Sequence, residues 1–229
     1  MTEPVRIVFA AFPNVTQLDF TAPHQAFSRL PGAVVTTAST AGGTLTADGL
    51  QFASLARLAD VSACDVLCIP GGHGVIEALG DEAFLHEIRR LAAGARFVTS
   101  VCTGSLALGA AGLLRGKRAA CHWAWRELLL PFGAIVDTGR VVRDGNLITG
   151  GGITAGIDLA LTVIAELAGP DVAQAIQLTL EYAPAPPFDA GRPETAPPEA
   201  VAFVRARMAA TVEPRRVAVE AAAQRMSAG

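Results

Sequence analysis

Residues 96–114 read RFVTSVCTGSLALGAAGLL, and this stretch decides the fold. Its first six residues form a short apolar and β-branched run, as expected of a strand buried on both faces. The run leads directly into Cys102, and residues 103–114 are rich in small residues and have the length of a helix. A strand that passes at once into a helix is the repeating unit of a parallel α/β sheet.

The same alternation extends to both sides of this stretch. Strands are expected at 5–12, 34–40, 66–69 and 147–149, a hairpin at 44–54, and short strands at 118–123, 134–137 and 141–143. Helices are expected from Thr21, as the cap, to about Leu30, at 75–91 with a break near Gly80, at 154–167 and at 171–182. The pattern predicts an α/β fold with a mainly parallel sheet and helices on both faces.

Six of the fourteen prolines lie between Pro184 and Pro198, which predicts an extended, semi-rigid segment. Helical patterns follow, to about Met208 and again over 215–226. We therefore expect residues 1–183 to form one α/β domain. Residues 184–229 would be a Pro-rich segment with two C-terminal helices, packed on that domain or on a dimer partner.

Composition excludes several classes of protein. The chain has 229 residues, 51% of them hydrophobic, so it can bury a large core and is not mainly disordered. Its net charge of −3 argues against a nucleic-acid-binding face. No run of about 18 residues is apolar throughout, and the first residues do not have the pattern of a signal peptide. We expect a cytoplasmic protein that binds neither nucleic acid nor membrane.

Cys102 is the strongest candidate for a catalytic residue. Ser100 and Gly104 lie two residues before and after it, which resembles the small-residue pattern of a nucleophile elbow. A helix N-terminus also favours the thiolate form of a cysteine. The alternative is a cysteine that only fills the core. The other three cysteines, Cys64, Cys68 and Cys121, are interpreted as packing residues, and no cluster has the ligand spacing of a metal site.

Two further junctions between strand and helix carry unusual residues. Gly71 and Gly72 follow the strand at 66–69, where their amides could stabilise negative charge on a substrate. The alternative is a tight turn without a ligand. Asp19 follows the first strand in an apolar environment, where it is either a helix-capping acid or a carboxyl partner for a thiol. A buried carboxyl of that kind would have a raised pKa and could carry a proton.

A third junction, GGGITA at 150–155, matches the relaxed G-x-G-x-x-A pattern of dinucleotide-binding turns. It lies late in the chain and no fitting acidic residue follows, so we favour close packing near the cysteine, with Ile153 as a pocket wall. His122 is expected to end the strand at 118–123. It is either the base of a Cys–His pair or a structural hydrogen-bonding residue.

These motifs together resemble the PfpI-like superfamily, whose fold is flavodoxin-like and whose members are usually dimers. Within it, QLDFTAPHQAF, IPGGHGV, HWAWREL and LEYAPAPPFDAG are similar to the isocyanide hydratases. The resemblance implies hydration of a small isocyanide to an N-substituted formamide by a homodimer that needs no metal or organic cofactor. It implies Cys102 as nucleophile, Asp19 as acid/base, Thr103 as a polar contact, and Gly151 and Ile153 close to the thiol.

Cys102 would attack the isocyanide carbon and form a thioimidate, while Asp19 moves the protons. One alternative is a glyoxalase or deglycase that acts on methylglyoxal, and another is a thiol redox sensor without enzymatic activity. Relatives of the protease and glyoxalase type usually have His where this chain has Thr103, which weakens the first alternative. AraC-type regulators carry a DNA-binding module after such a domain, and residues 199–229 are too few for one.

Overall fold

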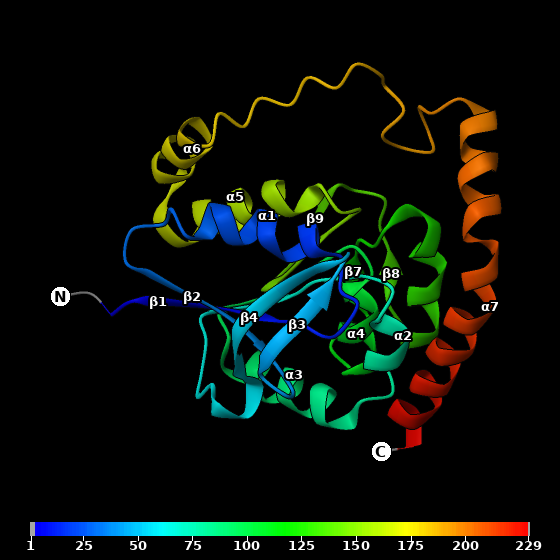
Figure 1. The fold of residues 1–229 in the computed structure, drawn as a ribbon, viewed down its shortest axis with the longest axis horizontal. Coiled ribbons are helices and arrows are strands. Elements are labelled where there is room, and N and C mark those ends of the chain that lie inside the picture. Colours follow the sequence, from blue (N-terminus) through cyan, green and yellow to red (C-terminus); the bar gives the residue numbers. More distant parts are fainter. Residues whose placement is uncertain (1–2, 229) are drawn as a thin grey trace.

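An eight-stranded sheet runs through the middle of the molecule in the computed structural model, which describes residues 3–228 (Figure 1). In spatial order its strands are β3 (Gly43–Ala47), β4 (Leu50–Arg57), β2 (Ala33–Ser39), β1 (Val5–Ala10), β5 (Val66–Ile69), β6 (Phe97–Val101), β10 (Leu147–Gly150) and β9 (Val141–Asp144). Only the two edge pairs, β3–β4 and β10–β9, are antiparallel. The predicted α/β, flavodoxin-like architecture is confirmed.

Helices cover both faces of this sheet (Figure 1). Helices α1 (Gln17–Phe27) and α5 (Ala155–Ala168) lie together on one face, while α3 (Glu82–Gly94) and α4 (Gly104–Ala110) lie on the other. The central strands β5 and β6 are therefore buried along their whole length, which explains why they read as unbroken apolar runs. The remaining elements are η1 (Leu58–Asp60), α2 (Val75–Ala78), β7 (Arg118–Ala119), η2 (Trp123–Phe132), β8 (Ile135–Val136), α6 (Pro170–Thr179) and α7 (Pro198–Ala228).

The first helix begins earlier than predicted. It starts at Gln17 and ends at Phe27, so the expected cap, Thr21, lies inside it. Thr16 makes no side-chain cap, and the Gln17 N–H instead donates to Oδ2 of Asp48 in the turn between β3 and β4 (2.8 Å). The start of the helix thus depends on a residue distant in sequence. As a consequence, Asp19 belongs to the first turn of α1.

The strand predicted at 118–123 is also shorter than expected, because β7 ends at Ala119. The next amide, of Ala120, donates to the Thr149 side chain (2.7 Å) and leaves the strand ladder. His122 does not end a strand: it is the N-cap of η2, and its Nδ1 accepts from the Ala124 N–H (3.3 Å). The helix after Cys102 is shorter too, ending at Ala110.

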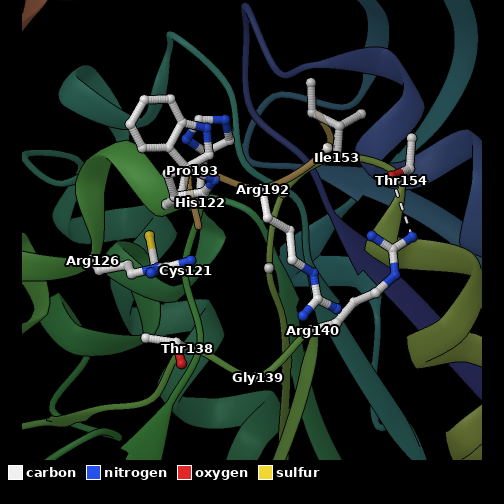
Figure 2. Close-up of a pocket in the computed structure, with 14 residues that line it drawn as sticks. Cys121, His122, Arg126, Thr138, Gly139, Arg140, Ile153, Thr154, Arg192 and Pro193 are labelled. Atoms are coloured by element: carbon white, nitrogen blue, oxygen red, sulfur yellow. Dashed lines mark hydrogen bonds between the residues drawn. The ribbon is translucent and has the colours of Figure 1, made fainter. Parts of the chain in front are cut away.

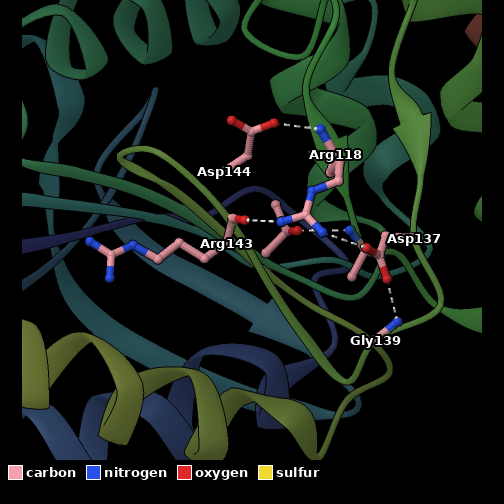
Figure 3. Close-up of polar contacts among 7 residues, drawn as sticks. Arg118, Asp137, Gly139, Arg143 and Asp144 are labelled. Carbon is pink, nitrogen blue, oxygen red and sulfur yellow. Dashed lines mark hydrogen bonds and ion pairs between the residues drawn. The ribbon is translucent and has the colours of Figure 1, made fainter.

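Arg118 ties β7 to the edge of the main sheet, as Figure 3 shows. Its backbone N–H donates to Asp144 Oδ2 (2.9 Å), and its Nη2 donates to the Arg143 carbonyl (2.9 Å). Its Nη1 pairs with Asp137 (3.4 Å), whose other oxygen accepts from the Gly139 N–H (2.9 Å). These contacts hold the small β7–β8 pair beside β9, and with it the chain that leads to His122.

The two C-terminal helices that we predicted are one continuous helix, α7, with Pro214 inside it. It packs against α2, α4 and η2 of the same chain, at the right of Figure 1. Val219 and Ala222 from α7 are buried in the core. No helix among residues 3–228 is both long enough and apolar enough to cross a bilayer.

Candidate active site

Cys102 sits at a strained turn between β6 and α4. Its φ is 59°, a left-handed conformation that is uncommon for a residue with a side chain. Its N–H points back to the carbonyl of Gly151 (2.7 Å). A Cβ at Gly104 would lie 2.1 Å from the Ile69 carbonyl oxygen, so only glycine fits two residues after the cysteine. The turn has the form expected of a nucleophile elbow.

Asp19 lies beside the thiol and is completely buried. Its Oδ2 accepts from the Gly71 N–H (2.9 Å), and its Oδ1 has no hydrogen-bond partner among the described residues. Burial raises the pKa of this carboxyl to about 7, against the opposing effects of the Gly71 amide and the Cys102 thiol. Asp19 is therefore poised to gain or lose a proton near neutral pH, as we expected of a buried carboxyl.

The thiol of Cys102 is not activated in the way that its place before a helix predicts. Burial raises its pKa well above the ordinary value, and the charges of Asp19 and Cys121 raise it further, although the Thr103 amide acts in the opposite direction. Helix α4 has only seven residues, and its dipole does not offset the loss of hydration. The cysteine rests as a neutral thiol, with its best proton acceptor, Asp19, beside it.

The glycine turn after β5 holds these side chains in place. The Gly71 amide donates to Asp19, and the Gly72 amide donates to Thr103 Oγ1 (2.9 Å). Both amides that we expected to face a substrate thus already have acceptors within the protein. A Cβ at Gly71 would lie 2.5 Å from the Thr103 nitrogen and 2.9 Å from Asp19 Oδ2. Glycine is required there so that the turn can approach the acid and the threonine.

Cys102 opens onto a cavity of about 150 Å³. Its lining brings together five residues that the sequence singled out, and adds a wall from α7 that the sequence did not predict. The lining residues are Thr16, Gly72, His73, Cys102, Thr103, His122, Trp125, Ile153, Arg207, Met208, Thr211 and Arg215. Gly71 and Asp19 lie behind this surface, and Gly151 lines a neighbouring cavity.

The neighbouring cavity, of about 230 Å³, is drawn in Figure 2. It shares His122 and Ile153 with the Cys102 cavity, so these two side chains form the wall between the two spaces. Figure 2 shows Arg140 directed towards Thr154, to which its Nη2 donates (3.3 Å). The same guanidinium pairs with Asp158 (2.8 Å), so its charge is balanced within the protein.

His122 is a neutral side chain in this wall. Burial lowers its pKa to about 4, and the nearby charges of Arg215 and Arg126 lower it further. Because Nδ1 accepts from the Ala124 amide, the ring proton is assigned to Nε2. The imidazole thus presents a donor rather than a base, which favours the structural alternative for this residue.

Arg215 is the residue of the site that sequence reasoning missed. It comes from α7, is 2% exposed, and its guanidinium carbon lies 4.0 Å above the ring of Trp125. One arginine on a helix that contains several others carries no local signal, since only the docking of α7 brings it to the cavity. Among residues 3–228, no group of three or more His, Cys, Asp and Glu side chains is arranged to hold a metal ion.

Several known proteins are similar to this chain in sequence or in fold. The family model described as "DJ-1/PfpI family" matches residues 5–166. The chain is 51% identical to an isonitrile hydratase of Pseudomonas putida, over 97% of this chain and 98% of that one. It is 32% identical to the HTH-type transcriptional regulator CdhR of Pseudomonas aeruginosa, over 58% of this chain and 40% of that one. A solved THiJ/PfpI family protein from Pseudomonas syringae superimposes with a TM-score of 0.88 at 40% identity, covering 96% of this chain and 90% of that one.

Proposed function

The chain belongs to the DJ-1/PfpI family, and from that premise we propose that it hydrates isocyanides, R–N≡C, to N-substituted formamides. The observation that carries the proposal is the near full-length similarity to an isonitrile hydratase, at 51% identity. The paired Cys102 and Asp19 at the elbow supply the nucleophile and the proton carrier that the reaction requires.

The first half of the proposed reaction forms a covalent intermediate. Asp19 takes the thiol proton, and the sulfur of Cys102 bonds to the terminal carbon of the isocyanide. The proton held by Asp19 passes to that same carbon, which gives a thioimidate, R–N=CH–S–Cys102. The buried thiol and a carboxyl with a pKa of about 7 support this step, because the proton can move between them at neutral pH.

Water completes the reaction. Asp19 accepts one proton from the attacking water and returns it to the substrate nitrogen, while the hydroxyl adds to the carbon. The carbon–sulfur bond then breaks, the hydroxyl proton returns to the thiol by way of Asp19, and R–NH–CHO leaves. The sum is one isocyanide and one water consumed for each formamide formed.

A direct test is formamide formation from a simple aryl isocyanide. Cys102→Ala should abolish turnover, and Asp19→Asn should reduce kcat by about 10²- to 10⁴-fold, the usual contribution of a positioned acid/base. Mass spectrometry of the protein mixed with substrate should detect an adduct on Cys102. Undiminished turnover by Cys102→Ala would contradict the proposed mechanism.

The alternative functions predict different outcomes in the same assays. Turnover of methylglyoxal in place of the isocyanide would indicate a glyoxalase or deglycase. Rapid oxidation of Cys102 by peroxide without hydratase turnover would indicate a redox sensor. The raised pKa of the Cys102 thiol disfavours the redox sensor, because an accessible sensor cysteine needs thiolate character at rest.

A further inference from the structure

Arg215 is a buried cation in the wall of the Cys102 cavity, and the carboxylate of Glu77 acts on its charge without reaching it as an ion pair among the described residues. It is 2% exposed, and its Nε has no hydrogen-bond partner. No ion pair within residues 3–228 involves its guanidinium, whereas the neighbouring Arg216 on the same helix pairs with Glu213 and Glu220. An arginine remains charged in proteins and is costly to bury unpaired, so this side chain requires an explanation.

Stacking on Trp125 explains only part of this arrangement. The ring lies 4.0 Å below the guanidinium carbon and offers its electron-rich face to the cation. A stacked guanidinium keeps its N–H donors in the plane of the fork, and the Nε donor of Arg215 has no acceptor among the described residues. Stacking on Trp125 thus satisfies one face of the guanidinium, while its donors line the cavity and can take another partner.

The rest of the cavity favours an anionic partner. Its lining includes a second arginine, Arg207, and contains neither aspartate nor glutamate. The thiol of Cys102 faces the same space and is neutral at rest, so it does not balance the charge of Arg215. A planar two-oxygen acceptor matches the guanidinium fork, and the volume of about 150 Å³ limits the partner to a small molecule.

We propose that Arg215 binds a carboxylate on the substrate, so that the preferred substrates are small isocyanides that also carry a carboxylate group. This inference rests on the proposed hydratase activity. The carboxylate would contact Arg215 in the α7 part of the lining, and the isocyanide carbon would lie against Cys102 in the same cavity. Binding energy from the charged end would then orient the reacting end.

The test compares isocyanoacetate with its methyl ester, which has no charge. The wild-type protein should have a kcat/KM for the acid at least about 10-fold above that for the ester. Arg215→Met should lower kcat/KM for the acid by about 10- to 100-fold, mainly through KM, and should change that for the ester little. Arg215→Lys should retain part of the preference, because it keeps the charge but loses the fork.

Arg216→Met is the matched control, since it removes an exposed arginine next to Arg215 on the same helix. It should leave both substrates unaffected. If the wild-type protein uses the ester as well as the acid, the proposal is wrong, whatever the variants do. An equal loss for both substrates in Arg215→Met would instead assign the arginine to thiolate stabilisation or to the packing of α7.

A binding experiment separates this inference from the proposed function. In the Cys102→Ala variant, calorimetry should detect isocyanoacetate binding, and a second substitution, Arg215→Met, should weaken it by at least about 10-fold. Binding of this kind without any turnover by the wild-type protein would retain the anion site and reject the hydratase activity. Turnover of neutral isocyanides without any preference for the acid would retain the hydratase activity and reject the anion site.

Discussion

Cys102 and Asp19 form one titrating unit, because each changes the pKa of the other. In the proposed reaction, the pair is inactive when both protons are present. Loss of one proton gives a state in which the remaining proton rests on sulfur, and its transfer to oxygen produces the thiolate that attacks. Under this mechanism the first ionisation of the pair controls activity, and its apparent pKa belongs to both residues.

This coupling predicts the pH profile of the reaction. Because burial raises the pKa of Asp19 to about 7, kcat/KM should rise with pH up to about 7 and then level off. Between about pH 8 and 9, where an ordinary thiol ionises, kcat/KM should not decrease, because the pKa of Cys102 is raised well above that range. Steady-state rates with a neutral aryl isocyanide, measured from pH 5 to about pH 9, provide the measurement.

Asp19→Asn is the control for this profile. Without the carboxylate, any residual activity should increase only at alkaline pH, where the thiol ionises unaided. If Asp19→Asn still shows the rise in kcat/KM near pH 7, the ionisation responsible for that rise belongs to another group.

Asp19 also predicts how stability depends on pH. Its pKa in the folded protein, about 7, lies above its ordinary value of 3.8, so the folded state holds this proton more tightly than the unfolded chain does. Stability is therefore lost as pH rises from about 4 to about 7, with a total cost of at most about 4 kcal/mol. The Asp19→Asn variant does not carry that cost. Its free energy of unfolding, relative to that of the wild-type protein, should therefore increase by about 2 to 3 kcal/mol from pH 5 to pH 8.

Urea unfolding of both proteins at the two pH values measures this difference. If the free energies of unfolding of the two proteins differ by the same amount at pH 5 and at pH 8, the Asp19 carboxyl does not titrate with a raised pKa in the folded state.

At the residue scale, sequence predicts what is local. Cys102, Thr103 and Asp19 follow strands, and parallel strands bring such positions to one edge of a sheet. Arg215 cannot be found in this way, because it reaches the cavity only when α7 packs across α4 and η2. The helix N-terminus favours the thiolate locally, whereas burial, which raises the pKa of Cys102, depends on the whole fold and has no local signal in the sequence.

At the element scale, the errors share a cause. The start of α1 is set by Asp48 from a different turn, so no residue near Thr21 reveals it. Helix α7 continues through Pro214, although proline usually breaks a helix interior. Arg215, Val219 and Ala222 are buried after this proline, and Met208 is partly buried against the core before it, so packing stabilises the helix enough to continue. Local propensity was overridden by tertiary contacts in both cases.

The packing of α7 can be tested with two valines on the same helix. Val219 is 0% exposed and Val217 is 51% exposed. Val219→Asp should destabilise the protein by roughly 3 to 5 kcal/mol, because it buries a charge without a partner. Val217→Asp should change stability by about 0.5 kcal/mol or less. Thermal unfolding followed by circular dichroism measures both, and similar melting temperatures for the two variants would contradict the docking of α7.

At the scale of the whole molecule, several large apolar side chains face solvent in the single chain. Leu178, Phe188 and Phe203 are 81%, 78% and 63% exposed. They lie on α6, on the Pro-rich segment and on α7, which are also the parts that follow the matched family region. Apolar side chains scattered singly over a surface are normal, and only a contiguous patch of them indicates a surface that another protein covers.

We propose a homodimer in solution, as the family resemblance implies, and the cytoplasm as its compartment. Sedimentation equilibrium should give a mass of twice the 23.6 kDa of one chain. A mass of one chain at the highest measurable concentration would reject the dimer. Fractionation of cells that express the protein would test the compartment.

The part of the chain that matches the family model ends at residue 166, well before α7 begins. The family model therefore does not include the α7 part of the cavity lining, although four of the twelve residues around the cavity come from α7. An exchange of residues 184–229 between relatives would change which molecules the cavity admits and would leave the elbow intact. In evolutionary terms, new substrate preferences can arise in the tail without disturbing the chemistry.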